Sequence, residues 1–171
     1  MKTHKLFTPR KVGSLTLKNR IVMAPMTRCR AIDNVPNELM EEYYTQRSSA
    51  GLIITEGTSP SPNGLGYARI PGIFSELQVA GWKEITKSVH KNEGKIFVQL
   101  MHSGRISHPL NMHKDAHILA PSAVKAAGQM WTDLKGLLDF VVPKEMTSQE
   151  ILHARTEYVA AAENALFAGF D

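Results

Sequence analysis

The sequence RIVMAPMTR at residues 20–28 decides the fold. It begins as a short apolar run with β-branched residues, which is typical of a buried strand and predicts one over residues 20–24. The run stops at Pro25, because proline cannot donate a ladder hydrogen bond, and the polar side chains of Thr27 and Arg28 follow at once. The stretch therefore predicts a strand that presents a hydroxyl group and a cation at its carboxyl end, where parallel α/β folds bind their ligands.

Two further apolar runs end in the same way. A strand predicted over residues 52–55 runs into Gly57, and a strand predicted over residues 95–100 contains Gln99 near its end. Helical patterns separate the three strands, which gives the order β-α-β-α-β and predicts a parallel α/β sheet with right-handed crossovers. We therefore expect Thr27, Gly57 and Gln99 to lie on one edge of the sheet.

Three helices are predicted from apolar spacing and capping signals. The first covers residues 37–49, where Leu39 and Tyr43 recur at helical intervals and Gly51 provides the stop. The second follows a capping box that starts at Ser75. Its apolar face comprises Val79, Trp82, Ile85 and Val89.

The third helix follows a second capping box, which starts at Thr147, and extends over residues 148–168 to a C-cap at Gly169. Its spacing predicts a buried stripe made of Ile151, Tyr158, Ala162 and Leu166. Phe170 and Asp171 then have the character of the first step of a fourth strand. The prediction for residues 1–171 is a single, incomplete α/β domain.

The remaining segments are read as a hairpin and two long loops. Residues 6–17 predict a small hairpin within residues 1–19, placed to close the bottom of a barrel. The loop after the second strand is rich in Pro and Gly, and long loops at strand ends are usually functional. Residues 101–146 predict an elaborated loop over the mouth of the fold, with a short strand-like run at residues 140–143 and room for a hairpin of its own.

Composition narrows the classes of function. The chain is 43% hydrophobic and 21% charged, which is typical of a soluble globular protein. Its net charge of +4 comes from scattered Lys and Arg rather than a basic stripe, so no nucleic-acid partner is predicted. No run approaches the roughly 18 apolar residues of a membrane span. A single cysteine excludes an internal disulfide and is compatible with a cytoplasmic location.

These motifs together resemble the N-terminal portion of the Old Yellow Enzyme family. Besides residues 15–28, the resemblance rests on ITEG at residues 54–57, GYARIPGI at 66–73, HSGR at 102–105, APS at 120–122 and AENALFAGFD at 162–171. Members of this family are FMN-dependent ene-reductases built on a TIM barrel. The resemblance extends over essentially the whole chain but only about the first half of a family member. It implies the first three βα units of a (β/α)8 barrel.

The resemblance implies a flavin site and an NAD(P)H-driven reduction of activated alkenes such as enals, enones and maleimides. The Gln99 amide both donates and accepts, and the matching Gln in the family pairs with flavin O2 and N3. The resemblance assigns to Thr27 a hydrogen bond to flavin O4 that tunes flavin reduction. Gly57 has no Cβ and is therefore expected to let the backbone come close to the O4 side of the flavin. The flavin ring would also be lined by Ala24, Pro25 and Met26.

Three residues are candidates for the substrate side. Met101 stands where many classical members have Trp, which leaves the substrate preference open. Tyr67 and Arg69 lie in the long second loop, where they face either the substrate or reduced nicotinamide, or simply pack on the rim. Taken alone, Thr27 is also compatible with a hydroxyl group in an ordinary loop. Gln99, taken alone, is also compatible with a core amide whose hydrogen bonds are made within the protein.

Four histidines and the cysteine have plainer interpretations. The spacing of His102, His108, His113 and His117 matches no standard zinc pattern, so no metal site is predicted. Cys29 follows Arg28 directly, and a plain loop cysteine is favoured over a reactive thiol.

The resemblance also implies features that fall outside residues 1–171: a His paired with Asn or His, a proton-donating Tyr, and the phosphate-binding loops. The expected partners are therefore a C-terminal half of the barrel or a second copy of the chain. Two alternatives stay open. One is a truncated or split, non-catalytic chain that acts in assembly without flavin, and the other is a related flavin barrel of the dienoyl-reductase type.

Overall fold

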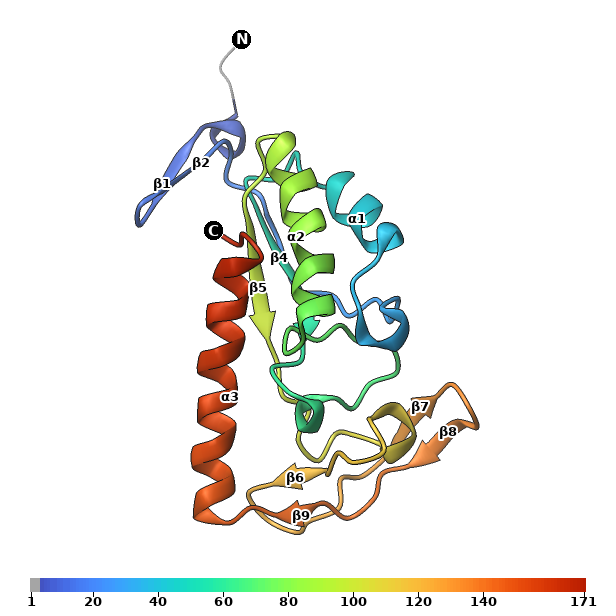
Figure 1. Cartoon of the computed structure of the whole chain (residues 1–171). Helices are drawn as coiled ribbons and strands as arrows, with labels where there is room; N and C mark the ends of the chain where they lie inside the picture. The colour runs from blue at the N-terminus through green and yellow to red at the C-terminus, as the bar shows by residue number, and fades with distance from the viewer. Residues whose placement is uncertain (1–3) are drawn as a thin grey trace.

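The computed structural model describes residues 4–171 and has at its centre a three-stranded parallel sheet. The strands β3 (Val22–Met23), β4 (Leu52–Thr58) and β5 (Ile96–Leu100) lie in the order β3-β4-β5. The helices α1 (Glu38–Thr45), α2 (Glu76–Lys91) and α3 (Ser148–Phe167) follow them in turn, and α1 and α2 lie together on one side of the sheet (Figure 1). The predicted α/β class with a parallel sheet is confirmed.

The β4–β5 pairing contains a bulge. Ile54 pairs with Phe97, but the next registered pair is Gly57 with Gln99, so β4 carries one extra residue between them. The amide of Gln99 donates to the Thr55 hydroxyl over 3.2 Å, which supplies a hydrogen bond that the interrupted ladder lacks. Bulges re-aim side chains and are common beside active sites.

The first strand is shorter and more exposed than the prediction of a buried strand over residues 20–24. β3 covers only Val22–Met23, and Val22 is 48% exposed. Within the described residues β3 pairs with β4 alone, so one edge and much of its apolar surface face solvent. The predicted apolar run is present, but the neighbours that would bury it are not.

The prediction for the first helix is too long at its C-terminal end. Asn37 caps α1 through its side chain, which accepts from the Met40 amide, and the helix ends at Thr45 rather than Ser49. Gly51 is not the helix stop. A Cβ there would lie 2.2 Å from the Asn19 carbonyl oxygen, so Gly51 allows the close approach of the segment before β3.

The second helix agrees with its predicted pattern. The Ser75–Gln78 capping box forms at its start. The predicted face packs into the main core, with Trp82, Ile85 and Val89 buried. The core also contains Met40 and Tyr44 of α1 rather than the helically spaced Leu39, which is exposed.

The third helix has the predicted bounds to within a residue, but its predicted buried stripe is wrong. The capping box at Thr147 forms, and Gly169 ends the helix with a φ of +86°, a conformation that favours glycine. The buried side chains are the small ones of Ala161 and Ala165. Large apolar side chains are exposed: Ile151, Leu152, Val159, Leu166 and Phe167.

Asp171 joins the end of this helix to β5. Its amide donates to the Ile96 carbonyl over 3.1 Å, and its carboxylate accepts from the Ile96 amide over 3.0 Å. The same carboxylate pairs with Lys95 at 2.6 Å and with His90 at 2.9 Å. Burial opposes ionisation of Asp171, but these bonds outweigh it and lower the pKa of the carboxyl group.

The elaborated loop lies beyond the carboxyl ends of the strands (Figure 1). It contains the antiparallel hairpin of β7 (Gln129–Thr132) and β8 (Gly136–Asp139), and β6 (Leu119–Ala120) paired in parallel with β9 (Lys144–Glu145). The strand-like run predicted at residues 140–143 is wrong, because these residues form the connection between β8 and β9. Short 3-10 helices occur at Ile32–Asn34, Pro62–Gly64 and Pro109–Asn111.

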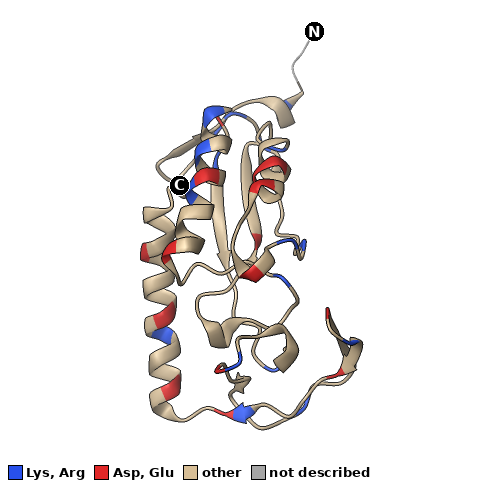
Figure 2. Cartoon of the chain, turned by 45° about the vertical axis from the view of Figure 1, so that its right-hand side comes forward, with Lys and Arg blue, Asp and Glu red and all other residues tan. Residues whose placement is uncertain are grey.

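The opposite end of the sheet carries an N-terminal hairpin. After a 3-10 turn at Lys5–Phe7, β1 (Arg10–Val12) pairs with β2 (Leu15–Leu17) around Gly13, whose φ is +58°. Charged residues of both signs are spread over helices and loops (Figure 2). Among residues 4–171, none of the helices combines the length and hydrophobicity that a membrane crossing requires.

Candidate active site

The three predicted site positions lie at the carboxyl edge of the sheet. Gly57 and Gln99 are registered partners in the β4–β5 ladder. Thr27 follows β3 in an extended segment, and its neighbour Arg28 donates its backbone amide to the Glu56 carboxylate over 3.1 Å. The segment that carries Thr27 is thus held beside the end of β4, next to Gly57.

The polar groups predicted to bind a flavin ring are free to do so. The side chains of Thr27 and Gln99 are exposed, and neither makes a hydrogen bond within residues 4–171. Ala24 and Met26 are also exposed, and Pro25 is half-buried. The donor set thus fits an FMN ring, because a hydroxyl group, an amide and apolar surface are available on one edge of the sheet.

Gly57 has a local role that the sequence did not indicate. A Cβ at this position would lie 2.5 Å from Cε and 2.6 Å from Sδ of Met101. The Met101 side chain therefore covers Gly57, and the small size of Gly57 makes room for it. The predicted contact of Gly57 with a flavin stays a prediction.

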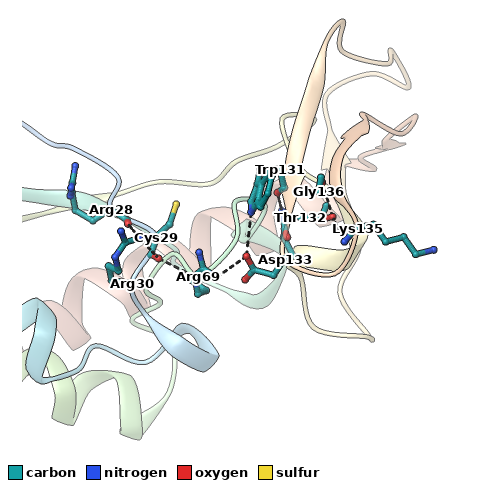
Figure 3. Close-up of polar contacts among 10 residues, drawn as sticks. Arg28, Cys29, Arg30, Arg69, Trp131, Thr132, Asp133, Lys135 and Gly136 are labelled. Carbon is teal, nitrogen blue, oxygen red and sulfur yellow. Dashed lines mark hydrogen bonds and ion pairs between the residues drawn. The ribbon is translucent and has the colours of Figure 1, made fainter.

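Arg69 is held by protein contacts on both sides (Figure 3). Its Nε donates to the Cys29 carbonyl over 3.0 Å, and its Nη1 pairs with Asp133 of the β7–β8 hairpin at 2.7 Å. Its φ of +52° is in the left-handed region, which non-glycine residues rarely adopt. Arg69 thus connects the segment after β3 to the hairpin. These contacts favour the packing role for Arg69 over a direct contact with substrate.

Tyr67 lies beneath the same hairpin. It is half-buried and packs against a small cluster formed by Ala126, Met130 and Phe140. This position also favours the rim-packing interpretation. The side chain of Met101 is partly exposed beside Gly57, where a molecule above the sheet edge would meet it.

The histidines make separate local contacts. His108 accepts from the Leu110 amide at a 3-10 turn, the His113 ring packs edge-on against Phe74, and the His117 amide donates to Asn63. Burial lowers the pKa of His102. Within the described part of the chain, no three His, Cys, Asp or Glu side chains gather as a metal site would require.

Cys29 is a partly buried loop residue with a φ of +56°. Burial and the nearby Glu56 carboxylate raise the pKa of its thiol, and these effects exceed the opposing influence of Arg69 and Arg30. A raised pKa disfavours the nucleophilic thiolate.

The sequence reasoning missed a buried pair, Glu56 and Tyr44. Glu56 is 1% exposed and accepts from the Tyr44 hydroxyl over 3.1 Å, and the Tyr44 oxygen accepts from the Glu56 amide over 2.9 Å. Burial raises the pKa of Glu56, and burial together with Glu56 raises the pKa of Tyr44. A charged residue inside an otherwise buried strand was the available signal, because carboxylates are almost never fully buried without partners.

Comparison with known proteins agrees with this geometry. The profile of the NADH:flavin oxidoreductase / NADH oxidase family matches residues 5–171. The chain is 43% identical to chanoclavine-I aldehyde reductase of Penicillium roqueforti over 98% of its length and 44% of the relative's. It is 41% identical to a probable flavin mononucleotide-dependent alkene reductase of Leishmania infantum, covering 97% of this chain and 47% of the other.

Solved structures give the same result. A morphinone reductase variant in complex with tetrahydroNAD superposes with a TM-score of 0.93 at 44% identity, covering 98% of this chain and 48% of that one. An old yellow enzyme homologue from Zymomonas mobilis superposes with a TM-score of 0.92 at 46% identity, covering 98% and 47%. The chain thus spans about half the length of these relatives, and the resemblance to the Old Yellow Enzyme family is confirmed. The protein belongs to the NADH:flavin oxidoreductase / NADH oxidase family.

Proposed function

We propose that the chain forms the N-terminal part of an FMN-dependent ene-reductase: a hairpin followed by the first three βα units of a (β/α)8 barrel. The observation that carries this proposal is the pair of exposed polar side chains of Thr27, in the segment after β3, and Gln99, on β5, since β3 and β5 flank β4. Gln99 would pair with flavin O2 and N3, and Thr27 would donate to O4. Bound FMN supplies a centre that accepts hydride from NAD(P)H and delivers it.

The overall reaction proposed is the reduction of an activated alkene. NAD(P)H is oxidised, and the alkene takes up a hydride at its β-carbon and a proton at its α-carbon. Within this chain, Ala24, Pro25 and Met26 would line the ring, and Met101 would contact the substrate. In the Old Yellow Enzyme family the proton comes from a tyrosine that matches none of residues 1–171.

The site would be completed by a C-terminal half of the barrel or, less simply, by a second copy of the chain. The exposed edge of β3 and the exposed apolar residues of α3 support this. A single cysteine supports a reducing compartment such as the cytoplasm. A defined oligomer that binds no flavin would instead support the non-catalytic assembly role.

A flavin titration tests the proposed site. Purified chain is titrated with FMN, alone and co-expressed with the C-terminal half of the Zymomonas mobilis homologue, and the flavin band near ~450 nm is followed after gel filtration. We expect stable retention only with the added half. Retention of FMN as tight with the chain alone would contradict the dependence on a second half.

The matched variants are Gln99→Ala and Gln149→Ala, both at exposed glutamines. Loss of one or two hydrogen bonds to the ring should weaken FMN binding about 10-fold in Gln99→Ala. Gln149→Ala on α3 should bind as the unaltered chain does. Equal affinities in the two variants would remove Gln99 from the site.

A further inference from the structure

Glu56 lies in the bulge of β4, immediately before Gly57. The bulge places it between the registered pairs of the ladder, and its side chain contacts the segment after β3 and helix α1 instead of solvent. Among residues 4–171 its hydrogen-bond partners are a phenol and a backbone amide, and the charge of Arg28 acts on it without a direct ion pair. A fully buried carboxylate whose hydrogen-bond donors are neutral is unusual and calls for a specific role.

The partners of Glu56 come from the segment after β3 and from helix α1. One carboxylate oxygen accepts from the Arg28 amide over 3.1 Å. The other oxygen accepts from the Tyr44 hydroxyl, which in turn accepts from the Glu56 amide. The backbone after Thr27 is thus tied to the residue that precedes Gly57.

The segment that carries Thr27 has few other anchors. No backbone hydrogen bond is found for residues 24–27 within the described chain. The next anchors are the Arg28 amide on Glu56, the Cys29 carbonyl, which accepts from Arg69 Nε over 3.0 Å, and the Ala31 amide on the Arg69 carbonyl. The Arg28 guanidinium adds a contact with the Tyr43 ring, at 5.5 Å from its centroid.

We propose that Glu56 is a positioning residue, which fixes the Thr27 hydroxyl relative to Gly57 and Gln99 by holding the Arg28 amide. This inference rests on the proposed function for the role of Thr27. The hydrogen bond between the Glu56 carboxylate and the Arg28 amide, which we call the clamp, does not itself require a flavin. A carboxylate accepts from two donors at once, the Arg28 amide and the Tyr44 hydroxyl group, and an alanine at position 56 would leave the Arg28 amide without this acceptor.

Hydrogen exchange tests the clamp without flavin. In the unaltered chain the Arg28 amide should exchange at least about 10-fold more slowly than the Thr27 amide, relative to their intrinsic rates. Glu56→Ala, which removes the acceptor, should abolish most of this difference. Glu42→Ala, at an exposed carboxylate of α1, should preserve it. Equal exchange of the two amides in the unaltered chain would overturn the proposal, whether or not the variants fold.

Tyr44→Phe gives a second measurement. It removes one partner of Glu56 but keeps the carboxylate, so it does not remove the charge that raises the pKa of Cys29. If the clamp holds this segment, labelling of the Cys29 thiol should be about 3-fold faster in Tyr44→Phe than in the unaltered chain. An unchanged labelling rate in folded Tyr44→Phe would contradict the clamp.

The link to the flavin is tested separately. With FMN bound, Glu56→Ala and Thr27→Ala should shift the flavin reduction potential in the same direction, and the double variant should shift it no further than Thr27→Ala does. Additive shifts would show that Glu56 does not act through Thr27. Failure of the unaltered chain, with its second half, to bind FMN would overturn the proposed function and leave the exchange result as the test of the clamp.

Discussion

Helices α2 and α3 begin alike and pack differently. Both start with a complete capping box. α2 buries Trp82 and other large side chains in the core, whereas α3 buries alanines and leaves Leu166 72% and Phe167 75% exposed. Both helices have an exposed side, but α2 packs a broad face of large side chains into the core, whereas α3 approaches the sheet closely through a few small residues. This contrast predicts different effects of substitutions in the two helices.

Trp82→Ala should destabilise the chain most, by about 3–5 kcal/mol, because it removes a fully buried ring and leaves a cavity. It also leaves the Gly72 carbonyl without the indole donor, which lies 3.1 Å away. Urea unfolding followed by circular dichroism measures the change. Leu77→Ala, at an exposed position of the same helix, should stay within about 0.5 kcal/mol. Similar losses in both variants would mean that the face of α2 that carries Trp82 stabilises the chain no more than its exposed face does.

Ala165→Leu should destabilise by about 1–3 kcal/mol, because a larger side chain does not fit where α3 approaches the core. Ala162→Leu is the control, since Ala162 is exposed on the same helix and Leu is also a good helix former. Thermal unfolding of the pair decides the point. A more stable Ala165→Leu would show that α3 packs loosely.

The N-cap residues of α2 and α3 should contribute equally to the free energy of unfolding. Ser75→Ala and Thr147→Ala each remove a side chain that accepts from the amide three residues on, at a cost of about 1 kcal/mol. Equal losses in denaturant midpoint, with an unchanged slope, would confirm that the helices differ in packing and not in initiation. A negligible loss for Thr147→Ala alone would show that the start of α3 frays.

Low pH should destabilise the contact between the end of α3 and β5, because it protonates the Asp171 carboxylate. Its folded-state pKa is lowered, so its contribution to stability is present above the unfolded pKa of about 3.9 and is lost as the pH falls through the folded value. Asp171→Asn should therefore flatten the fall of unfolding free energy below about pH 4. An unchanged pH profile in Asp171→Asn would contradict this assignment.

The sequence predicted what depends on near neighbours along the chain. Capping boxes, the parallel strand order and the α2 face all follow from local spacing, and the structure agrees. The α3 stripe failed because spacing alone does not tell which of two apolar faces meets the sheet, and small residues at 161 and 165 allow the closer approach. Thr27 and Gln99 were predicted as site residues, and their side chains are exposed. Glu56 was missed because its partners, Tyr44 on α1 and Arg28 after β3, belong to other segments of the chain.

The bonds of Asp171 have a consequence for how a barrel would grow. The amide of Asp171 already donates to the Ile96 carbonyl at the outer edge of β5, as the first rung of a parallel ladder would. The register of a strand that continued from Asp171 would thus be set by the pairing of Asp171 with Ile96. Since a slip of one residue reverses which side chains face the core, this hydrogen bond would favour one alignment of such a strand over its neighbours.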